Sequence, residues 1–368
     1  MKILHIIPSL HGGGAEKFCI DLCNEMSKTH DVTICSLFDI EKDMFMAKAI
    51  SSRVKVITLN KKLGFDSSIF FKIFKLMRKE KYEIVNTHLR ALMYSALGVF
   101  FTKSRFFHTV HNMANKETSK INMNLYKIFF KFLHVTPIAI SRMVLESIKT
   151  EYGNEYNVLI ENGVSKPRAT EKLDEVKKEV LLLKHDESTK VFLTIGRIAA
   201  QKNHKMLIKV FNRLVLEGEN IILLLIGDDY EDKKPLLSEL KIMASKGVYF
   251  LGMKENVADY FLCADVFCLS SLYEGLPITL LESLALGIPS ICTPAGGIVD
   301  VINDGENGWL SKDFSEEAFY QAIKKYLASD EVTKLKVSSN AKDSFVKKYS
   351  IALTSKNYIN LYEETENV

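Results

Sequence analysis

The sequence has few residues of the kinds that mark fibrous, disordered or disulfide-stapled chains. Its 368 residues include 18 glycines, 7 prolines and one tryptophan, too few glycines and prolines for a fibrous or disordered chain. The six cysteines never form a C-x-x-C pair, and most lie in apolar runs such as FLCADVFCLS (261–270). This placement indicates buried, reduced thiols rather than a metal site or disulfides. A chain of this length buries large cores without such staples.

Long apolar runs are also missing. The chain begins MKILHIIPSL, which is too short for a secretory signal and is interrupted by His5 and Pro8. No later apolar run approaches the roughly 18 residues that cross a bilayer, so we expect a cytoplasmic protein without a transmembrane span. The sequence contains no D-x-D pair, no G-x-S-x-G and no H-E-x-x-H. Metal-dependent and hydrolytic mechanisms therefore lose support, and we expect no metal or other cofactor.

The net charge is small but unevenly distributed. The formal value is +4, yet residues 51–150 contain 18 Lys and Arg against 5 Asp and Glu. Aromatic residues alternate with these cations in FDSSIFFKIFKLMRKEKYE (65–83) and NMNLYKIFFKFLH (122–134). This composition suits a surface that lies on anionic lipid, and it equally suits ordinary helices with phenylalanine in the core. No nucleic-acid motif accompanies the basic stretch, so nucleic acid is not an expected partner.

Short apolar segments alternate with longer helical patterns along the whole chain. Seven candidate strands are followed by five more, at 2–8, 31–38, 54–60, 82–89, 105–111, 137–141, 157–164, and then 190–198, 221–229, 247–253, 265–271 and 289–294. Helix-sized spacers between strands indicate βαβ units and parallel sheets. We expect an α/β fold with two Rossmann-like, doubly wound domains, residues 1–168 and 169–346. We expect residues 347–368 to form a helix that crosses back to the first domain.

Ligands of doubly wound domains bind beyond the carboxyl ends of the strands. Two such domains in tandem predict a central cleft, lined by segments that directly follow strands. Several of these segments contain glycine, at 11–18, 196–204, 226–229, 251–256 and 295–300. Glycine lets backbone N–H groups approach a ligand closely.

The segment SSLYEGLPITLLESLALGIP (270–289) combines a loop with a helix. Pro277 is expected to open the helix, and Gly287 is expected to end it. Glu274 precedes the helix and Glu282 lies inside it. A carboxylate in an apolar helix is costly to bury unless it accepts hydrogen bonds, and sugar hydroxyls are suitable donors. The alternatives are an exposed face for Glu282 and a capping role for Glu274.

The segment GRIAAQKNHKMLIKVF (196–211) places two cations after a buried strand and before an amphipathic helix. Arg197 and Lys202, together with the helix N-terminus, would form a diphosphate site that needs no metal. The alternative is that both are solvated surface charges.

Near the amino end, HGGGAEKF (11–18) has neither the G-x-G-x-x-G spacing nor that of a P-loop. Gly13 and Gly14 would still allow backbone donors to face a ligand, and a plain turn remains the alternative. His88 and His111 each follow a strand of the first sheet and are expected at the same cleft. For His111 a structural role is favoured.

In this order the segments resemble the retaining family 4 glycosyltransferases, which have the GT-B fold, over nearly the full length. The matching stretches are GGGAEK, NTHL, TVHN, PIAIS, IENGV, GRIAAQKNH, LIGDD, LGMKENVADYFLCADVFCLSSLYEGLPITLLESLALGIP and GGIVDVINDGENGWL. The resemblance implies that Arg197 and Lys202 bind the donor diphosphate. It implies that Glu282 holds the ribose hydroxyls and that Glu274 contacts the donor sugar.

The resemblance also assigns roles to loops around these residues. It implies that backbone N–H groups near Leu276 and Ile278 meet the phosphate and sugar hydroxyls. Pro277 departs from family versions with glycine and has no N–H to donate. The nucleotide base is expected near Gly252 and Met253.

In the first domain, the resemblance implies that Gly13 and Gly14 close over the phosphate and that His88 lies beside the sugar. The implied reaction moves a sugar from a nucleotide donor, with retention at the anomeric carbon, to a glycan or lipid-linked acceptor in bacterial surface polysaccharide synthesis. UDP is the expected nucleotide because it is the commonest in the family. The basic first domain is then expected to contact the anionic inner face of the cell membrane. The alternative enzyme class is the non-hydrolysing UDP-sugar epimerase, which shares the fold and the donor.

Overall fold

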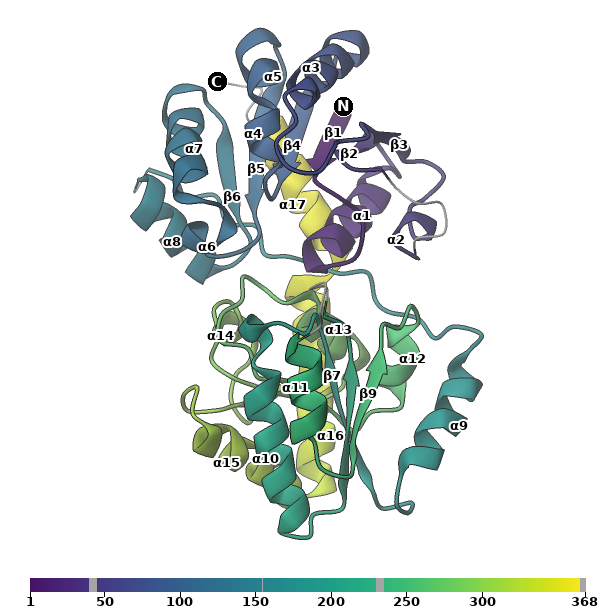
Figure 1. Ribbon diagram of the computed structural model, residues 1–368. Coiled ribbons are helices and arrows are strands. Elements are labelled where there is room, and N and C mark those ends of the chain that lie inside the picture. Colours follow the sequence, from purple (N-terminus) through teal and green to yellow (C-terminus); the bar gives the residue numbers. More distant parts are fainter. Residues whose placement is uncertain (40–44, 154, 230–234, 365–368) are drawn as a thin grey trace. The chain divides into compact units, whose positions relative to one another are not determined.

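The computed structural model describes residues 1–39, 45–153, 155–229 and 235–364 (Figure 1). The chain divides into two compact units. Unit 1 comprises Met1–Ser165 and Tyr349–Val368, and unit 2 comprises Lys166–Lys348. Unit 2 starts three residues before the second domain expected from the sequence, residues 169–346, and ends two residues after it. The end of the expected C-terminal helix, residues 365–368, lies outside the described residues.

A six-stranded parallel sheet forms the centre of unit 1, counted over the described residues. Its strands are β1 (Lys2–Ile7), β2 (Asp31–Ser36), β3 (Lys55–Thr58), β4 (Ile84–His88), β5 (Arg105–Val110) and β6 (Thr136–Ala139). Their order is β3-β2-β1-β4-β5-β6. Helices cover both faces (Figure 1), which is why β1 and β4 are buried almost throughout, although β4 ends in the polar residues Asn86, Thr87 and His88.

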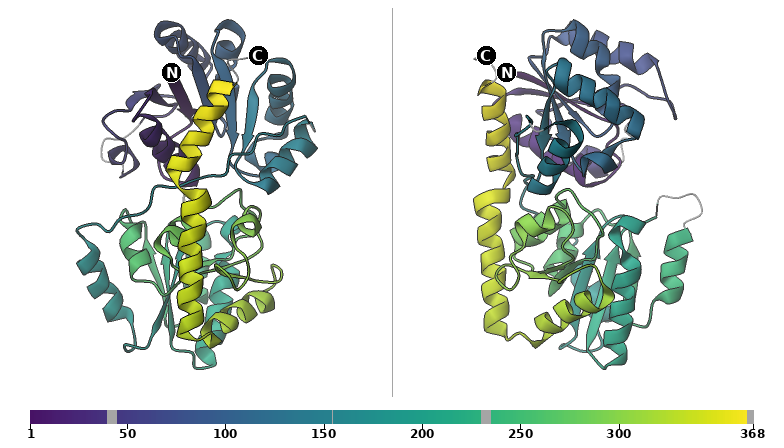
Figure 2. Two further views of the ribbon diagram at one scale, coloured as in Figure 1. Left: turned by 180° about the vertical axis from the view of Figure 1, so that it is seen from behind. Right: turned by 90° about the vertical axis from the view of Figure 1, so that its left-hand side faces the viewer.

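The helices of unit 1 come from both ends of the chain. They are α1 (Gly14–Met26), α2 (Phe45–Lys48), α3 (Ser68–Glu80), α4 (Ala91–Tyr94), α5 (Ala96–Phe101), α6 (Ala114–Glu117), α7 (Lys120–Phe132), α8 (Arg142–Tyr152) and α17 (Ile351–Glu364). The last of these, α17, lies along unit 1 beside α1 (Figure 2). Two of its tyrosines are fully buried. The Tyr358 hydroxyl lies 3.1 Å from Thr109 Oγ1, and Asn86 donates to the Tyr362 hydroxyl at 3.0 Å.

Unit 2 repeats the architecture around a second parallel sheet. Its strands are β7 (Lys190–Ile195), β8 (Ile221–Ile226), β9 (Val248–Gly252), β10 (Val266–Leu269), β11 (Ser290–Cys292) and β12 (Trp309–Leu310), in the order β12-β11-β10-β7-β8-β9. Its helices are α9 (Leu173–Leu183), the short 3₁₀ helix η1 (Ala200–Lys202), α10 (His204–Leu216), α11 (Pro235–Met243), α12 (Val257–Leu262), α13 (Ile278–Leu286), α14 (Ile298–Val301), α15 (Glu316–Ala328) and α16 (Glu331–Ser344). A π-helical segment, η2 (Phe345–Tyr349), follows α16. The prediction of two doubly wound domains is confirmed.

Two details of the predicted sheets are wrong. The seventh candidate strand, 157–164, pairs only at single residues, as isolated bridges from Leu159 to Ala139 and from Val164 to Ser350. Its backbone also meets the start of α17, because a Cβ on Gly163 would lie 2.4 Å from Thr354 Oγ1. Conversely, the sequence analysis missed β12, whose two residues are too few to show a strand period.

The core of unit 2 explains why so short a strand is held. Trp309 of β12 is 1% exposed and packs edge-on against Tyr326 of α15, with ring centroids 5.2 Å apart. Phe192 of β7 lies between Tyr326 and Phe211 of α10, at centroid distances of 5.8 and 5.0 Å. Aromatic burial of this kind adds to the main-chain pairing of β12 with β11 at the edge of the sheet.

The six cysteines are all free, and five of them are buried; Cys263 is half-buried. Within the described part of the chain, we find no helix that has both the length and the apolar character to cross a bilayer.

We expect Tyr358→Ala to destabilise unit 1 by roughly 3–5 kcal/mol, because it removes a fully buried aromatic ring at the junction of α17 with the sheet. Urea unfolding followed by circular dichroism measures this change. Phe132→Ala, at a side chain that is 65% exposed, is the control and should shift the midpoint little. If the urea midpoint of Tyr358→Ala equals that of the control, burial of Tyr358 does not stabilise unit 1.

Candidate functional site

The strand order of unit 2 reverses between β7 and β10, which are neighbours in the sheet but far apart in the sequence. In doubly wound sheets, ligands bind beyond the carboxyl ends of the strands at such a reversal, because the following segments diverge to opposite faces. Arg197 and Lys202 follow β7, and Glu274 follows β10. The fold therefore brings the two charged segments predicted from the sequence to one edge of one sheet.

Lys202 and Glu274 form an ion pair at this edge. Lys202 Nζ lies 2.7 Å from Glu274 Oε1, and the two side chains are 18% and 9% exposed. The same oxygen accepts a hydrogen bond from the Ser271 hydroxyl at 2.7 Å, and the Gln201 amide lies 3.4 Å from the other oxygen. These donors offset the cost of burying the carboxylate. Lys202 is therefore not a solvated surface charge, and the donors to Glu274 are side chains rather than the N-terminus of α13.

Arg197 lies at the same edge with its side chain exposed. Its backbone is held on both sides, since Gly196 N donates to Ile226 O at 3.0 Å and Ile198 N donates to Asp228 O at 2.9 Å. The stem of Lys202 crosses directly over Gly196, where a Cβ would lie 3.2 Å from Lys202 Cε. The site thus combines an exposed guanidinium with an ammonium that is already paired.

Hydrogen bonds join the loop after β7 to the loop after β10. Leu272 N donates to Gln201 O at 2.8 Å, and Gln201 Nε2 donates to Tyr273 O at 2.8 Å. The Ser270 hydroxyl donates to Lys202 O, also at 2.8 Å. The ion pair is therefore set in a framework of main-chain contacts.

A third loop, after β11, supports Glu274 from behind. Gly297 N donates to Gly275 O at 3.0 Å. Gly296 has a φ of +56°, and a Cβ there would lie 1.8 Å from Glu274 O. Only glycine fits this close approach and this backbone conformation.

Helix α13 starts and stops as the sequence predicted. Pro277 is its N-cap residue, and Gly287, with a φ of 72°, is its C-cap. Glu282 is 3% exposed, so the alternative that it lies on an exposed face is wrong. Leu276 and Ile278 are 4% and 6% exposed, so their side chains lie in the core and contacts to a ligand would have to come from their backbone. The ligand roles of these residues stay predictions.

Gly252 and Met253 lie at the end of β9, at the carboxyl edge of the same sheet. Gly252 has a φ of +67°, and a Cβ there would meet nothing within 4 Å. Met253 is 55% exposed. The pair forms an open surface at this edge, where the sequence analysis placed the nucleotide base.

Unit 1 has a reversal of strand order between β1 and β4. The glycine loop follows β1: Gly13 is the extended N-cap of α1, and Gly14 is the first residue of the helix. Both glycines are exposed. His88 is the last residue of β4. The candidate residues of unit 1 therefore flank its own reversal, as those of unit 2 do.

His88 is completely buried within a row of three imidazoles. Its Nε2 lies 2.9 Å from His5 Nδ1, and its Nδ1 lies 2.9 Å from His111 Nε2. Burial lowers the pKa of His5, and it holds the pKa of His111 well below its usual value. Nearby, burial raises the pKa of Glu117 to about 8. The hydrogen bond to His88 agrees with the structural role favoured for His111, while a contact of His88 with a sugar stays a prediction.

Comparison with known proteins covers both units. The family model described as Glycosyl transferases group 1 matches residues 177–344, and the model described as Glycosyltransferase Family 4 matches residues 12–166. The chain belongs to the family 4 glycosyltransferases. An N-acetylgalactosaminyltransferase of Campylobacter jejuni is 25% identical over all of this chain and 99% of its own length. A galactosyltransferase of Escherichia coli is 24% identical over 78% of this chain and 76% of its own.

Solved structures share the fold of this glycosyltransferase. HepE of Anabaena superposes with a TM-score of 0.84 at 18% identity, covering 99% of this chain and 100% of that one. Sucrose-phosphate synthase of Thermosynechococcus elongatus has a TM-score of 0.81 at 18% identity and covers all of both chains. The expected GT-B fold class is confirmed, and the glycosyltransferase class of enzyme is established with it.

Three residues of the candidate site were not assigned from the sequence. Gln201 and Ser271 contact the Glu274 carboxylate, and Gly296 packs against its backbone. Gln201 lies inside the predicted diphosphate segment, and Gly296 lies in a glycine pair that the sequence analysis noted. The contacts themselves depend on loops from three strands and have no local signal.

We expect Gly296→Ala to reduce glycosyl transfer by about 100-fold or more, because its methyl group would displace the backbone of Glu274. A radiolabelled transfer assay measures the change. Gly305→Ala is the matched control: it has a similar φ of +77°, but the nearest atom, Lys325 Nζ, lies 3.9 Å away. The control should lose about 1 kcal/mol of stability through backbone strain and keep its activity. Equal activity of the two variants would disprove the role of the close approach.

Proposed function

We propose that this glycosyltransferase moves a sugar from a UDP-sugar to a lipid-linked glycan acceptor, with retention of anomeric configuration and without a metal ion on the diphosphate. The observation that carries the proposal is the arrangement of Lys202, Glu274 and Arg197 at the strand-order reversal of unit 2. Two cations and a carboxylate at one sheet edge match a diphosphate next to a sugar.

The cations supply the chemistry that a leaving diphosphate needs. Negative charge builds on the bridging oxygen as the glycosidic bond breaks, and preorganised cations stabilise that charge. Lys202 is held by Glu274 before a ligand arrives, and Arg197 is exposed to meet it. The departing oxygen then accepts the proton of the acceptor hydroxyl on the same face of the sugar, which gives retention.

The choice of donor and acceptor rests on similar proteins. HepE of Anabaena is described in complexes with UDP, with UDP and glucose, and with UDP-glucose. The names of the C. jejuni and E. coli relatives specify acceptors carried on undecaprenyl diphosphate. These names support a UDP-sugar donor and a lipid-linked acceptor in bacterial glycan synthesis. Both matched family models describe glycosyltransferases, so the epimerase alternative is not favoured.

We expect Lys202→Ala and Arg197→Ala each to reduce transfer by about 100- to 1000-fold, because each removes a cation from the leaving group. Transfer from a panel of UDP-, GDP- and ADP-sugars to a synthetic undecaprenyl-diphosphate-linked sugar measures this, with NMR to read the anomeric configuration of the product. Activity in the wild-type protein should be unchanged when Mg²⁺ or Mn²⁺ is added.

Lys205→Ala is the matched control, since Lys205 follows closely in the chain but pairs with Glu239 at the surface. It should retain full activity. An inverted product, or near wild-type turnover in either test variant, would contradict the mechanism. Epimerisation of the donor without an acceptor would favour the alternative class.

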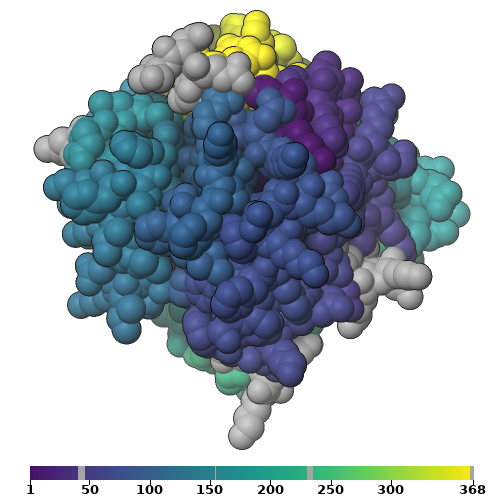
Figure 3. All heavy atoms as spheres, turned by 90° about the horizontal axis from the view of Figure 1, so that it is seen from above, coloured from purple at the N-terminus to yellow at the C-terminus, as the bar shows by residue number. Residues whose placement is uncertain are grey.

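The proposal includes contact of unit 1 with an anionic membrane. Its helices leave large apolar side chains exposed, among them Phe71 (66%), Phe100 (57%) and Phe101 (67%). The helices α3 and α5 that carry them are packed together, with Phe74 and Phe101 ring centroids 6.0 Å apart. The part of unit 1 that contains α3 and α5 is coloured blue and occupies the middle of the face seen in Figure 3. Exposed cations such as Lys75 lie on the same helices. Apolar rings among cations suit the interface of an anionic bilayer.

We expect the protein to sediment with vesicles of phosphatidylglycerol and phosphatidylcholine at low salt, and Phe71→Ser with Phe100→Ser to weaken this binding at least about 10-fold. Leu335→Ser, at an exposed position of unit 2 (69%), is the control and should bind normally. Failure of the wild-type protein to bind these vesicles would remove the membrane contact from the proposal.

A further inference from the structure

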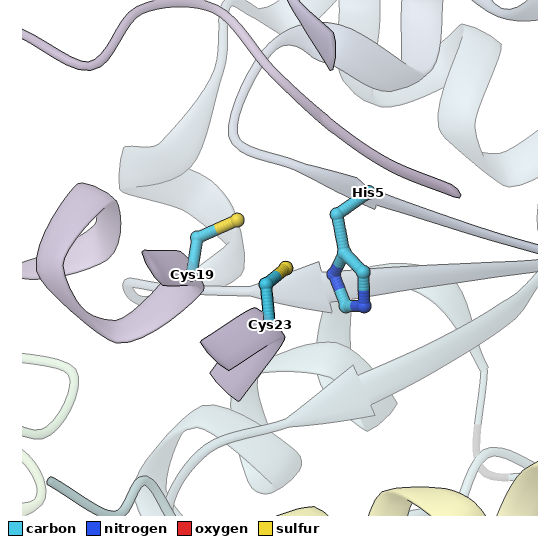
Figure 4. Close-up of side chains that lie close together, drawn as sticks. All are labelled: His5, Cys19 and Cys23. Atoms are coloured by element: carbon cyan, nitrogen blue, oxygen red, sulfur yellow. The ribbon is translucent and has the colours of Figure 1, made fainter. Parts of the chain in front are cut away.

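A cluster of sulfur and nitrogen atoms lies inside unit 1, where α1 packs on β1. Cys19 and Cys23 are four residues apart on α1 and so project from the same side of the helix. Their Sγ atoms and one ring nitrogen of His5 all lie within 4.8 Å of one another, and the three side chains are buried. Figure 4 shows the Nδ1 edge of the His5 ring turned toward the sulfur atoms.

We propose that this cluster binds a soft divalent cation, best represented by Zn²⁺, through Cys19 Sγ, Cys23 Sγ and His5 Nδ1. Around a tetrahedral zinc ion, with bonds of about 2.3 Å to sulfur and 2.0–2.1 Å to nitrogen, neighbouring ligand atoms lie roughly 3.5–3.8 Å apart. The three atoms lie no more than 4.8 Å apart, so the largest separation that they can have exceeds this geometry by only about 1 Å. Small side-chain movements would therefore close the site.

The charge and softness of the ligands select the cation. Two thiolates and a neutral imidazole balance a divalent ion, so the filled site adds no net charge to an apolar interior. Sulfur and imidazole ligands suit zinc and similar metals, whereas Mg²⁺ and Ca²⁺ require oxygen ligands. The cluster contains no carboxylate.

His88 lies next to the cluster, although it is not one of its three members. His88 Nε2 lies 2.9 Å from His5 Nδ1, which makes it the nearest candidate for the fourth position. The other nitrogen of His88 is hydrogen-bonded to His111 at 2.9 Å, the kind of contact that orients metal-bound imidazoles. A metal would replace the hydrogen bond between His5 and His88 by two coordinate bonds.

Ordinary packing of thiols is the simpler interpretation, and Cys35 of β2 illustrates it. Burial raises the pKa of Cys35 to about 12, and this residue is not part of the cluster. Cys35 is therefore a matched control: a buried cysteine of the same unit without neighbouring ligands.

The filled site would fasten α1 to β1. The first turn of α1 begins at Gly14, directly after the exposed Gly13. A metal held between helix and strand would stabilise the support of this glycine loop. The site is fully buried, so we expect the metal to enter during folding and to exchange slowly.

The test measures metal content directly, independently of glycosyl transfer. Wild-type protein from zinc-supplemented culture, passed through gel filtration with EDTA, should retain about one zinc ion per chain by mass spectrometry of the metal. Refolding with Co²⁺ in place of zinc should give the near-ultraviolet charge-transfer absorption of thiolate–cobalt bonds. Cys19→Ser and Cys23→Ser should each lose most of the metal and this absorption, and Cys35→Ser should keep both.

Metal retained by both test variants, or a wild-type protein that holds no zinc and shows no cobalt–thiolate absorption after refolding, would overturn the proposal. The wild-type measurements remain decisive if a test variant does not fold. If the wild-type protein holds no zinc after this purification but transfers sugar normally, the metal site is disproved and the proposed function stands. If the protein holds zinc but shows no glycosyl transfer, only the proposed function is disproved.

Discussion

The site of unit 2 depends on one constraint: β7 and β10 are neighbours in the sheet, so the loops that follow them start side by side. Main-chain bonds between these loops set the distance that the Lys202–Glu274 pair then spans. A buried ion pair adds little net stability, because desolvation offsets its attraction. Its value here is positional. The pair holds a cation at the sheet edge, between loops that the fold has already placed.

The two units use the same topology for different electrostatics. In unit 2, the strand-order reversal carries charged side chains that are partly open to solvent. In unit 1, the corresponding place holds glycine backbone and, beneath it, a row of three imidazoles, of which burial lowers the pKa of His5 and of His111. A Rossmann-like sheet thus fixes where a site can form. The residues after the first and fourth strands of each sheet decide which functional groups lie there.

The sequence alone predicted features that depend on local patterns. Apolar runs located eleven of the twelve strands found in the described parts of the chain, and Pro277 and Gly287 located the ends of α13. The charged segments located Lys202 and Glu274. Features that depend on packing were missed. No local pattern shows that Gly296 supports Glu274, since the two lie on different loops. Cys19 and Cys23 have helical spacing, but their neighbour His5 lies on a strand, and only the packing of α1 on the sheet unites them. The strand β12 is held by Trp309 rather than by its own length.

The placement of α17 has a consequence for biosynthesis. The helix that buries Tyr358 and Tyr362 against unit 1 is also the last described helix of the chain. A ribosome releases chains from the amino end, and domains usually fold in that order. Here unit 1 is completed by α17 only after Lys166–Lys348 have been synthesised, whereas unit 2 is contiguous in the sequence. The sheet of unit 1 therefore lacks the helix that buries Tyr358 and Tyr362 until translation has passed residue 364.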